Sequence, residues 1–152
     1  MVQIAVADPT SQDARWCIEQ YYTELGQRFE TGFDATLGIS AHAHELVPPA
    51  GLLLVARLRE EPVGCGALKF HENTVGELKR MWVAPRARGL GLGRRLLEAL
   101  EHKAREAGMT VIHLETNHTL IEAITLYRRA GYQEVAAFND EPYAHHWFEK
   151  RL

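Results

Sequence analysis

The chain has 152 residues, a length that fits one domain with its own hydrophobic core. Hydrophobic residues make up 46% of it and charged residues 24%, which is typical of a globular protein and excludes a disordered chain. The net charge of -3 argues against a nucleic-acid-binding protein, because such a protein presents an extended basic surface.

The sequence contains no apolar run long enough to cross a bilayer, and the start MVQIAVADPT lacks the basic and apolar regions of a signal peptide. We therefore expect a cytoplasmic protein with neither a membrane nor a nucleic acid as partner. The two cysteines, Cys17 and Cys65, show no paired spacing, so we expect both to lie in the core as small hydrophobic side chains.

The N-terminal third predicts a short strand over residues 3–7 and then a helix. Apolar residues recur every three or four positions over residues 11–28, which indicates a helix with one buried face. Residues 29–51 mix glycine, proline and acids, and we expect an elaborated loop there with a short helix near 40–46. Long loops on compact domains often build binding sites.

The middle of the chain predicts three consecutive strands, over residues 52–58, 63–70 and 74–83, joined by short polar turns. Such strands form an antiparallel meander. Leucines then mark a helix from residue 92, which Gly108 ends.

The C-terminal part predicts a strand over residues 110–116, a helix over 119–131, and strands over 132–138 and 145–152. Taken together, the order of elements predicts a mixed sheet with helices packed on it, in the α/β or α+β class.

The segment RARGLGLGRR, residues 86–95, gathers arginines and glycines where a strand turns into a helix. The first amides of a helix lack partners and carry partial positive charge. Glycines at 89, 91 and 93 let a ligand approach that backbone closely, so we predict an anion site that suits a pyrophosphate.

Other uses of such a glycine-rich turn fit this segment less well. A dinucleotide fold would place an acidic residue at the end of a parallel strand about twenty positions later, and a P-loop would close with Gly-Lys-Ser/Thr. Neither pattern is present. The remaining alternative is a helix start with a flexible entry and a solvated basic face.

Residues 88–93, Arg-Gly-Leu-Gly-Leu-Gly, preceded by ELKRMWVAP, closely resemble the Arg/Gln-x-x-Gly-x-Gly/Ala signature of the GNAT superfamily of N-acetyltransferases. HLETN followed by EAITLYRRAGY is similar to the strand, helix and strand that follow the signature in that family. The resemblance covers almost the whole chain and implies a single acetyltransferase domain over residues 1–152. The tail FNDEPYAHHWFEKRL resembles a bacterial branch, some of whose members are fused to MarR-type transcription regulators, although no winged-helix segment is present here.

The resemblance implies acetyl-CoA as cofactor and acetyl donor. It also implies a GNAT-like, mostly antiparallel sheet of about seven strands with helices on both faces, in which strands 76–83 and 110–116 splay apart to seat the pantetheine arm. It maps CoA binding onto Met81, Trp82, Val83, Arg88, Gly89, Leu90, Gly91, Leu92, Gly93, Arg94, Asn117 and Tyr127.

Acetyl transfer to an amine needs a base for the amine's proton, a donor to the developing oxyanion and an acid for the leaving thiolate. By resemblance Glu77, at the start of the thioester-binding strand, is the predicted base. A surface glutamate paired with Lys79, and a water chain without a dedicated base, stay open. Glu72, His71 and Glu30 are further alternatives for the base. Tyr127 matches a tyrosine near the CoA sulfur and is the predicted acid, with a purely structural core aromatic as the alternative.

Acceptor specificity in such folds comes from the first helix, the loop after it and the turn before the last strand. These segments supply acids beside aromatic rings, which suit a cationic amine. The candidate substrate-binding residues are Tyr22, Glu30, Phe33, Asp34 and Tyr143, and the same segments also supply Asn139, Asp140 and Glu141.

We expect the acceptor to be a primary amine of a small molecule. A protein lysine or N-terminus, and a non-catalytic acyl-CoA-binding regulatory module, stay open as alternatives. Dimers are common in the family, so a homodimer is a candidate assembly. The histidine pairs 42/44 and 145/146 lack a carboxylate or thiolate at ligand spacing, and we expect no metal site.

Overall fold

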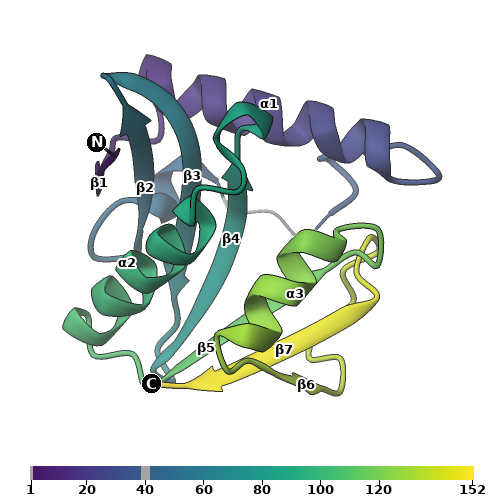
Figure 1. Cartoon of the computed structure of the whole chain (residues 1–152). Helices are drawn as coiled ribbons and strands as arrows, with labels where there is room; N and C mark the ends of the chain where they lie inside the picture. Colours follow the sequence, from purple (N-terminus) through teal and green to yellow (C-terminus); the bar gives the residue numbers. More distant parts are fainter. Residues whose placement is uncertain (1, 39–41) are drawn as a thin grey trace.

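The computed structural model describes residues 2–38 and 42–152, which form one sheet covered by helices on both faces (Figure 1). The elements are β1 (Val2–Val6), α1 (Gln12–Arg28), η1 (Ala43–Leu46), β2 (Gly51–Leu58), β3 (Glu61–Phe70), β4 (Val75–Val83), η2 (Pro85–Ala87), α2 (Leu92–Glu106), β5 (Val111–Thr116), α3 (Ile121–Arg129), β6 (Gln133–Val135) and β7 (His146–Arg151).

The sheet has seven strands in the order β1-β2-β3-β4-β5-β7-β6. Every neighbouring pair runs antiparallel except β4 and β5, which run parallel. The predicted mixed, mostly antiparallel sheet is therefore confirmed. None of the described helices combines the length and the apolarity needed to cross a bilayer.

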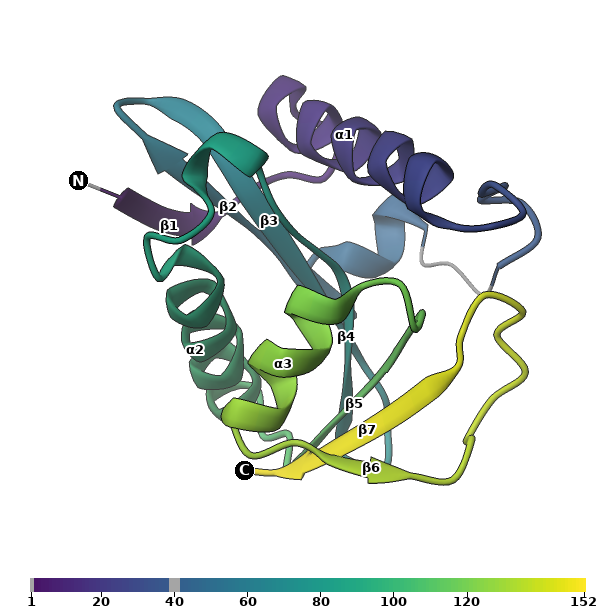
Figure 2. The same cartoon turned by 45° about the vertical axis from the view of Figure 1, so that its right-hand side comes forward.

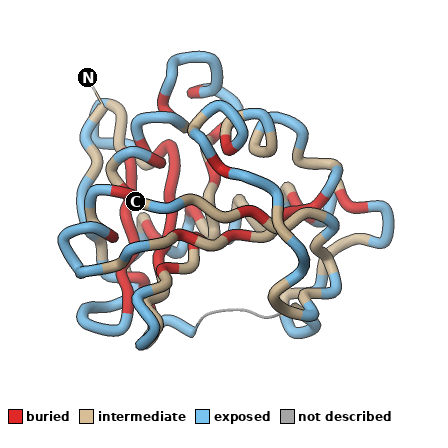
Figure 3. Tube along the Cα trace, turned by 90° about the horizontal axis from the view of Figure 1, so that it is seen from below, coloured by how far each residue is buried: buried red, intermediate tan, exposed pale blue. Residues whose placement is uncertain are grey.

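Strand β2 explains why helices cover both faces. Successive side chains of a strand point to opposite sides, so a strand that is apolar throughout needs a cover on each side. Leu53 and Val55 pack in one core with Cys17 of α1, whereas Leu52 and Leu54 pack in the other with the leucines of α2. Figure 2 shows α1 on one side of the sheet and α2 and α3 on the other, and the buried trace in Figure 3 follows the central strands.

The parallel strands β4 and β5 stay paired for only three residues. Val75, Gly76 and Glu77 pair with residues 111–113, and beyond them the two strands separate. On its other side β4 carries a bulge between Lys79 and Trp82, where Arg80 adopts a left-handed φ of 55°. The predicted splayed pair is thus confirmed, with its opening after Glu77.

Two element boundaries differ from the sequence prediction. Strand β6 ends at Val135 rather than at 138, because the chain leaves the sheet edge and Asn139 accepts a hydrogen bond from the Trp147 indole at 2.9 Å. Helix α3 begins at Ile121 rather than at 119, because the Asn117 side chain accepts the Thr119 N–H at 3.0 Å. The short helix predicted near 40–46 appears as η1, and residues 39–41 lie outside the described residues.

Candidate active site

A groove runs along the N-terminus of α2. Gly89 and Gly91 have φ angles of 82° and 74°, a left-handed conformation that favours glycine, and Gly91 is the N-cap of the helix. The first hydrogen bond of α2 joins the Arg95 N–H to the Gly91 carbonyl at 3.2 Å. The amides of residues 92–94 therefore have no partner within the helix and are available to an anion.

The predicted cofactor residues gather along this groove. Its lining includes Met81, Trp82, Val83, Arg88, Gly89, Gly91, Leu92, Gly93 and Arg94. Three predicted residues are not in this lining: Leu90, which is 65% exposed, and Asn117 and Tyr127, which line a second cavity. Amides without helix partners, two left-handed glycines and two guanidinium groups together fit the diphosphate of coenzyme A.

One acidic residue in the groove has no counterpart in the sequence prediction. Glu24 of α1 accepts hydrogen bonds from Arg88 at 2.6 and 2.8 Å and from the Trp82 indole at 3.2 Å. The Arg28 guanidinium lies 3.3 Å from the same carboxylate. Glu24 therefore neutralises the arginine that opens the glycine-rich turn.

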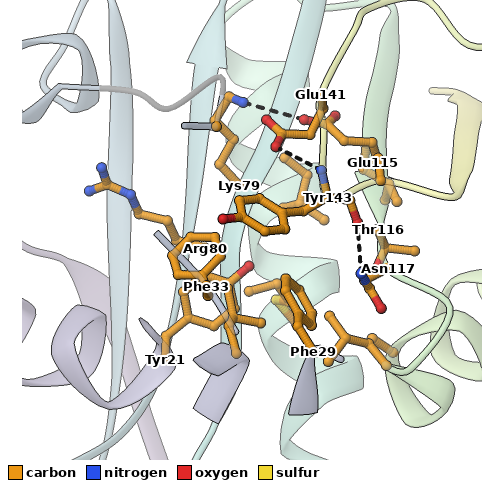
Figure 4. A pocket seen from close by; sticks show the side chains of 18 of the residues that line it. Tyr21, Phe29, Phe33, Lys79, Arg80, Glu115, Thr116, Asn117, Glu141 and Tyr143 are labelled. Carbon is orange, nitrogen blue, oxygen red and sulfur yellow. Dashed lines mark hydrogen bonds and ion pairs between the residues drawn. The ribbon is translucent and has the colours of Figure 1, made fainter. Parts of the chain in front are cut away.

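A second cavity lies where β4 and β5 separate (Figure 4). It adjoins the groove, since the linings of both include Tyr21, Leu25, Met81, Leu120 and Ala123. Its walls come from α1 and the segment after it, from residues 78–81 of β4, from 114–117, from α3 and from 141–144. A ligand in this cavity would lie next to one bound along the groove.

Four aromatic side chains line one end of the cavity. The Phe33 ring lies 5.3 Å from the Tyr22 ring, 5.8 Å from Phe29 and 4.9 Å from Tyr143, measured between centroids. The Tyr143 hydroxyl accepts the Asp34 N–H at 2.9 Å, and the Tyr143 carbonyl accepts the Asn117 side-chain amide at 2.8 Å. These bonds hold the segments around the cavity together.

Glu115, from the end of β5, is the buried carboxylate of the cavity. Its side chain is 10% exposed, and Oε1 lies 3.7 Å from Lys79 Nζ. Oε2 is the one buried side-chain oxygen or nitrogen of the described residues that has no hydrogen-bond partner. Burial raises the pKa of this carboxyl above its usual range, although the Lys79 ammonium opposes the shift.

Glu77, the predicted base, is not part of the cavity lining, but it pairs with Lys79, which is. Its carboxylate is 3.1 Å from Lys79 Nζ and 2.5 Å from His71 Nε2. Burial acts to raise the pKa of Glu77, but Lys79 and then His71 outweigh it and hold that pKa below its usual value. Lys79 thus bridges Glu77 and Glu115.

Tyr127 of α3, the predicted acid, is 5% exposed and lines the cavity. Burial raises the pKa of its hydroxyl well above the usual value. Asn117 also lines the cavity, with both ends of its amide bonded to the protein, to Thr119 and to Tyr143.

The five predicted acceptor residues divide into two groups. Tyr22, Phe33 and Tyr143 line the cavity, whereas Glu30 and Asp34 do not. The Glu30 side chain is 79% exposed, and the Asp34 carboxylate turns back to accept hydrogen bonds from Thr36 at 2.7 and 2.9 Å. Within residues 2–38 and 42–152, no group of three or more histidines, cysteines or acids is arranged to hold a metal ion.

Sequence reasoning missed several lining residues, among them Phe29, Lys79 and Glu115 of the cavity and Glu24 of the groove. The alternation along HLET was a usable signal for Glu115, because it places that side chain on the face opposite buried Leu114 and Thr116. Glu141 was predicted only as part of the turn before the last strand, together with Asn139 and Asp140, and of these three it is the one that lines the cavity.

Comparison with known proteins agrees with this geometry. The family model described as "Acetyltransferase (GNAT) family" matches residues 14–132. An IAA acetyltransferase of Azospirillum brasilense is 37% identical over 138 residues, which cover 90% of this chain and 88% of that protein.

Solved structures share the fold. A Klebsiella pneumoniae protein assigned as an acyl-CoA N-acyltransferase superposes with a TM-score of 0.81 at 31% identity, over 100% of this chain and 98% of that one. A Bacillus anthracis protein assigned as a streptothricin acetyltransferase, in complex with acetyl coenzyme A, gives a TM-score of 0.63 at 21% identity, over 75% of this chain and 69% of that one. The chain belongs to the GNAT family of acetyltransferases, and it is an acyltransferase that uses acetyl-CoA.

Proposed function

We propose that the protein transfers the acetyl group of acetyl-CoA to a primary amine of a small molecule, by direct attack of the amine on the thioester. The observation that carries the proposal is the unpartnered oxygen of Glu115 in a cavity that adjoins the glycine-rich groove. A buried carboxylate oxygen without a donor is costly to keep, and an ammonium N–H would satisfy it.

Glu115 is the proposed general base. An alkylamine has a pKa of about 10.4, so it reaches the site protonated and must lose a proton before it attacks. A carboxylate with a raised pKa accepts that proton more readily than an ordinary one. Glu77, held by Lys79 and His71, is proposed to fix the Lys79 ammonium that keeps Glu115 ionised.

Tyr127 is the proposed general acid for the CoA thiolate. Its hydroxyl is neutral at physiological pH, as an ordinary tyrosine is, and burial raises its pKa further, so it has a proton to donate. Its place in the cavity lining, on the α3 side, supports this role.

A small acceptor is favoured over a protein lysine by a hydrogen bond that joins two segments of the cavity wall. The Tyr143 hydroxyl bonded to the Asp34 N–H ties the segment before β7 to the segment after α1. A peptide substrate would need an open groove between these two segments.

The test is a screen of amines and lysine peptides with acetyl-CoA, in which released CoA is measured with a thiol reagent. The proposal predicts CoA release that depends on small amines. Release with peptides alone would favour protein acetylation. Tight acetyl-CoA binding without release under any condition would favour a regulatory module.

A further inference from the structure

The cavity between β4 and β5 has a polar end and an apolar end. In Figure 4 the carboxylates of Glu115 and Glu141 lie toward one end, the Phe29 and Phe33 rings lie toward the other, and Tyr143 lies between them. An acceptor that fills the cavity must therefore present different chemistry at its two ends.

The apolar end is a surface of ring faces and edges. Tyr22, Phe33 and Tyr143 are half-buried, and the Phe29 ring lies 5.5 Å from the Tyr143 ring. The cavity lining also includes Leu25, Leu78, Leu114 and Leu120, whose side chains offer no hydrogen bonds. This end suits a flat apolar group, because aromatic rings gain from stacked and edge contacts beyond the burial of area.

The polar end can accept a hydrogen bond from one donor group of a ligand. Glu115 has one oxygen near Lys79 and one oxygen that accepts nothing from the described residues. Over the whole lining the charged groups are two carboxylates, Glu115 and Glu141, and two cations, Lys79 and Arg80, of which Arg80 lies at the aromatic end with its guanidinium carbon 6.0 Å from the Tyr22 ring centroid. The lining is therefore close to neutral, and it offers no excess negative charge to a substrate with several ammonium groups.

From this arrangement we infer that the acceptor is a monoamine with an aromatic or similarly flat apolar body, whose ammonium meets Glu115 while its ring packs among Phe29, Phe33 and Tyr143. The inference rests on the proposed function, since it names the substrate class of that same site.

Competition kinetics with matched amines test it. The panel is 2-phenylethylamine as the aromatic monoamine, L-phenylalanine as the same ring with an added carboxylate, spermidine as a polycation, and an acetylatable lysine peptide. We expect kcat/KM for 2-phenylethylamine to exceed each of the other three at least tenfold. A higher value for any of the other three would overturn the inference.

Variants at the apolar end test whether its aromatic side chains bind the amine. Phe33→Ala should raise the KM for 2-phenylethylamine by roughly tenfold, the loss of one aromatic contact, and leave the KM for acetyl-CoA unchanged. Phe33→Tyr should restore the parental KM. Phe138→Ala is the matched control, because Phe138 stacks on His113 at 4.3 Å and is not part of the cavity lining. An unchanged amine KM in Phe33→Ala would contradict the inference.

Calorimetry with acetyl-CoA distinguishes a failure of the proposed function from a failure of the aromatic-monoamine inference alone. If the protein binds no acetyl-CoA, the proposed function itself fails. If it binds acetyl-CoA but its best acceptor is spermidine, L-phenylalanine or the peptide, the aromatic-monoamine inference fails while the acetyl-CoA site stands. The same conclusion follows if it binds acetyl-CoA and acetylates none of the panel.

Discussion

The groove at α2 and the cavity between β4 and β5 adjoin each other but are built in different ways. The groove takes most of its lining from residues 81–94, one continuous stretch that contributes left-handed glycines and unpaired amides. The cavity takes its lining from side chains of six separate segments, and these include the buried carboxylate of Glu115.

This difference separates what each region controls. A ligand held by main-chain amides depends on backbone conformation, so changes in the groove should act on the affinity for acetyl-CoA. A ligand held by side chains and their charges depends on individual residues, so changes in the cavity should act on kcat and on the KM for the amine.

The largest effect is expected from Glu115→Gln. Loss of the base should lower kcat/KM for the amine by about 10²- to 10³-fold, with the acetyl-CoA affinity unchanged. Glu77→Gln is the control and should lose much less, because Glu77 acts through Lys79. Steady-state kinetics of both variants decide the point, and an equal or larger loss in Glu77→Gln would return the role of base to Glu77.

Glu115→Gln should also change how the stability of the protein depends on pH. The folded protein holds a proton on Glu115 more tightly than the unfolded chain does, because burial raises the pKa of this carboxyl. The contribution of Glu115 to stability should therefore fall as pH rises from the unfolded pKa, about 4.3, through the higher folded value. The melting temperature of Glu115→Gln relative to the parent should rise over that range. A difference that stays constant with pH would contradict the burial argument.

In the groove, Gly91→Val should weaken acetyl-CoA binding by about 100-fold, since a β-branched residue disfavours the left-handed φ of 74° that aims the first amides of α2. Gly108→Val is a matched control, because Gly108 has a φ of 84°, open space around it and a place at the far end of the helix. Calorimetry should find near-parental acetyl-CoA affinity in the control. Equal weakening in both variants would show a general loss of folding instead.

Tyr127→Phe should lower kcat by about 10- to 100-fold and change acetyl-CoA affinity little, because only the proton donor is removed. Tyr132→Phe removes another buried hydroxyl, the one that donates to Glu101 at 2.9 Å outside both cavities, and should leave kcat near the parental value. An unchanged kcat in Tyr127→Phe, measured with the best acceptor, would reject the role of acid.

The smallest effect is expected from Glu24→Gln. Glu24 competes with a bound phosphate for Arg88, so loss of its charge should lower the KM for acetyl-CoA by about two- to fivefold. Glu19→Gln makes the same charge change on the exposed face of α1 and serves as the control. A raised KM in Glu24→Gln would mean that Glu24 positions Arg88 rather than competing for it.

The two regions also differ in how far the sequence predicts them. The succession of strands and helices along the chain and the glycine-rich turn follow from local patterns, because periodicity and φ preferences are properties of neighbouring residues. Glu115 and Glu141 become lining residues only once β4 and β5 separate and residues 136–145 leave the sheet edge. That separation depends on tertiary packing, and no local pattern around Glu141 reports it.

The most direct measurement is a crystal structure of Glu115→Gln with acetyl-CoA and 2-phenylethylamine, a complex that this variant turns over slowly enough to trap. The account predicts the diphosphate on the amides of residues 92–94 and the amine nitrogen within hydrogen-bond distance of the residue 115 side chain. A diphosphate bound elsewhere, or an amine nitrogen seated away from residue 115, would contradict it.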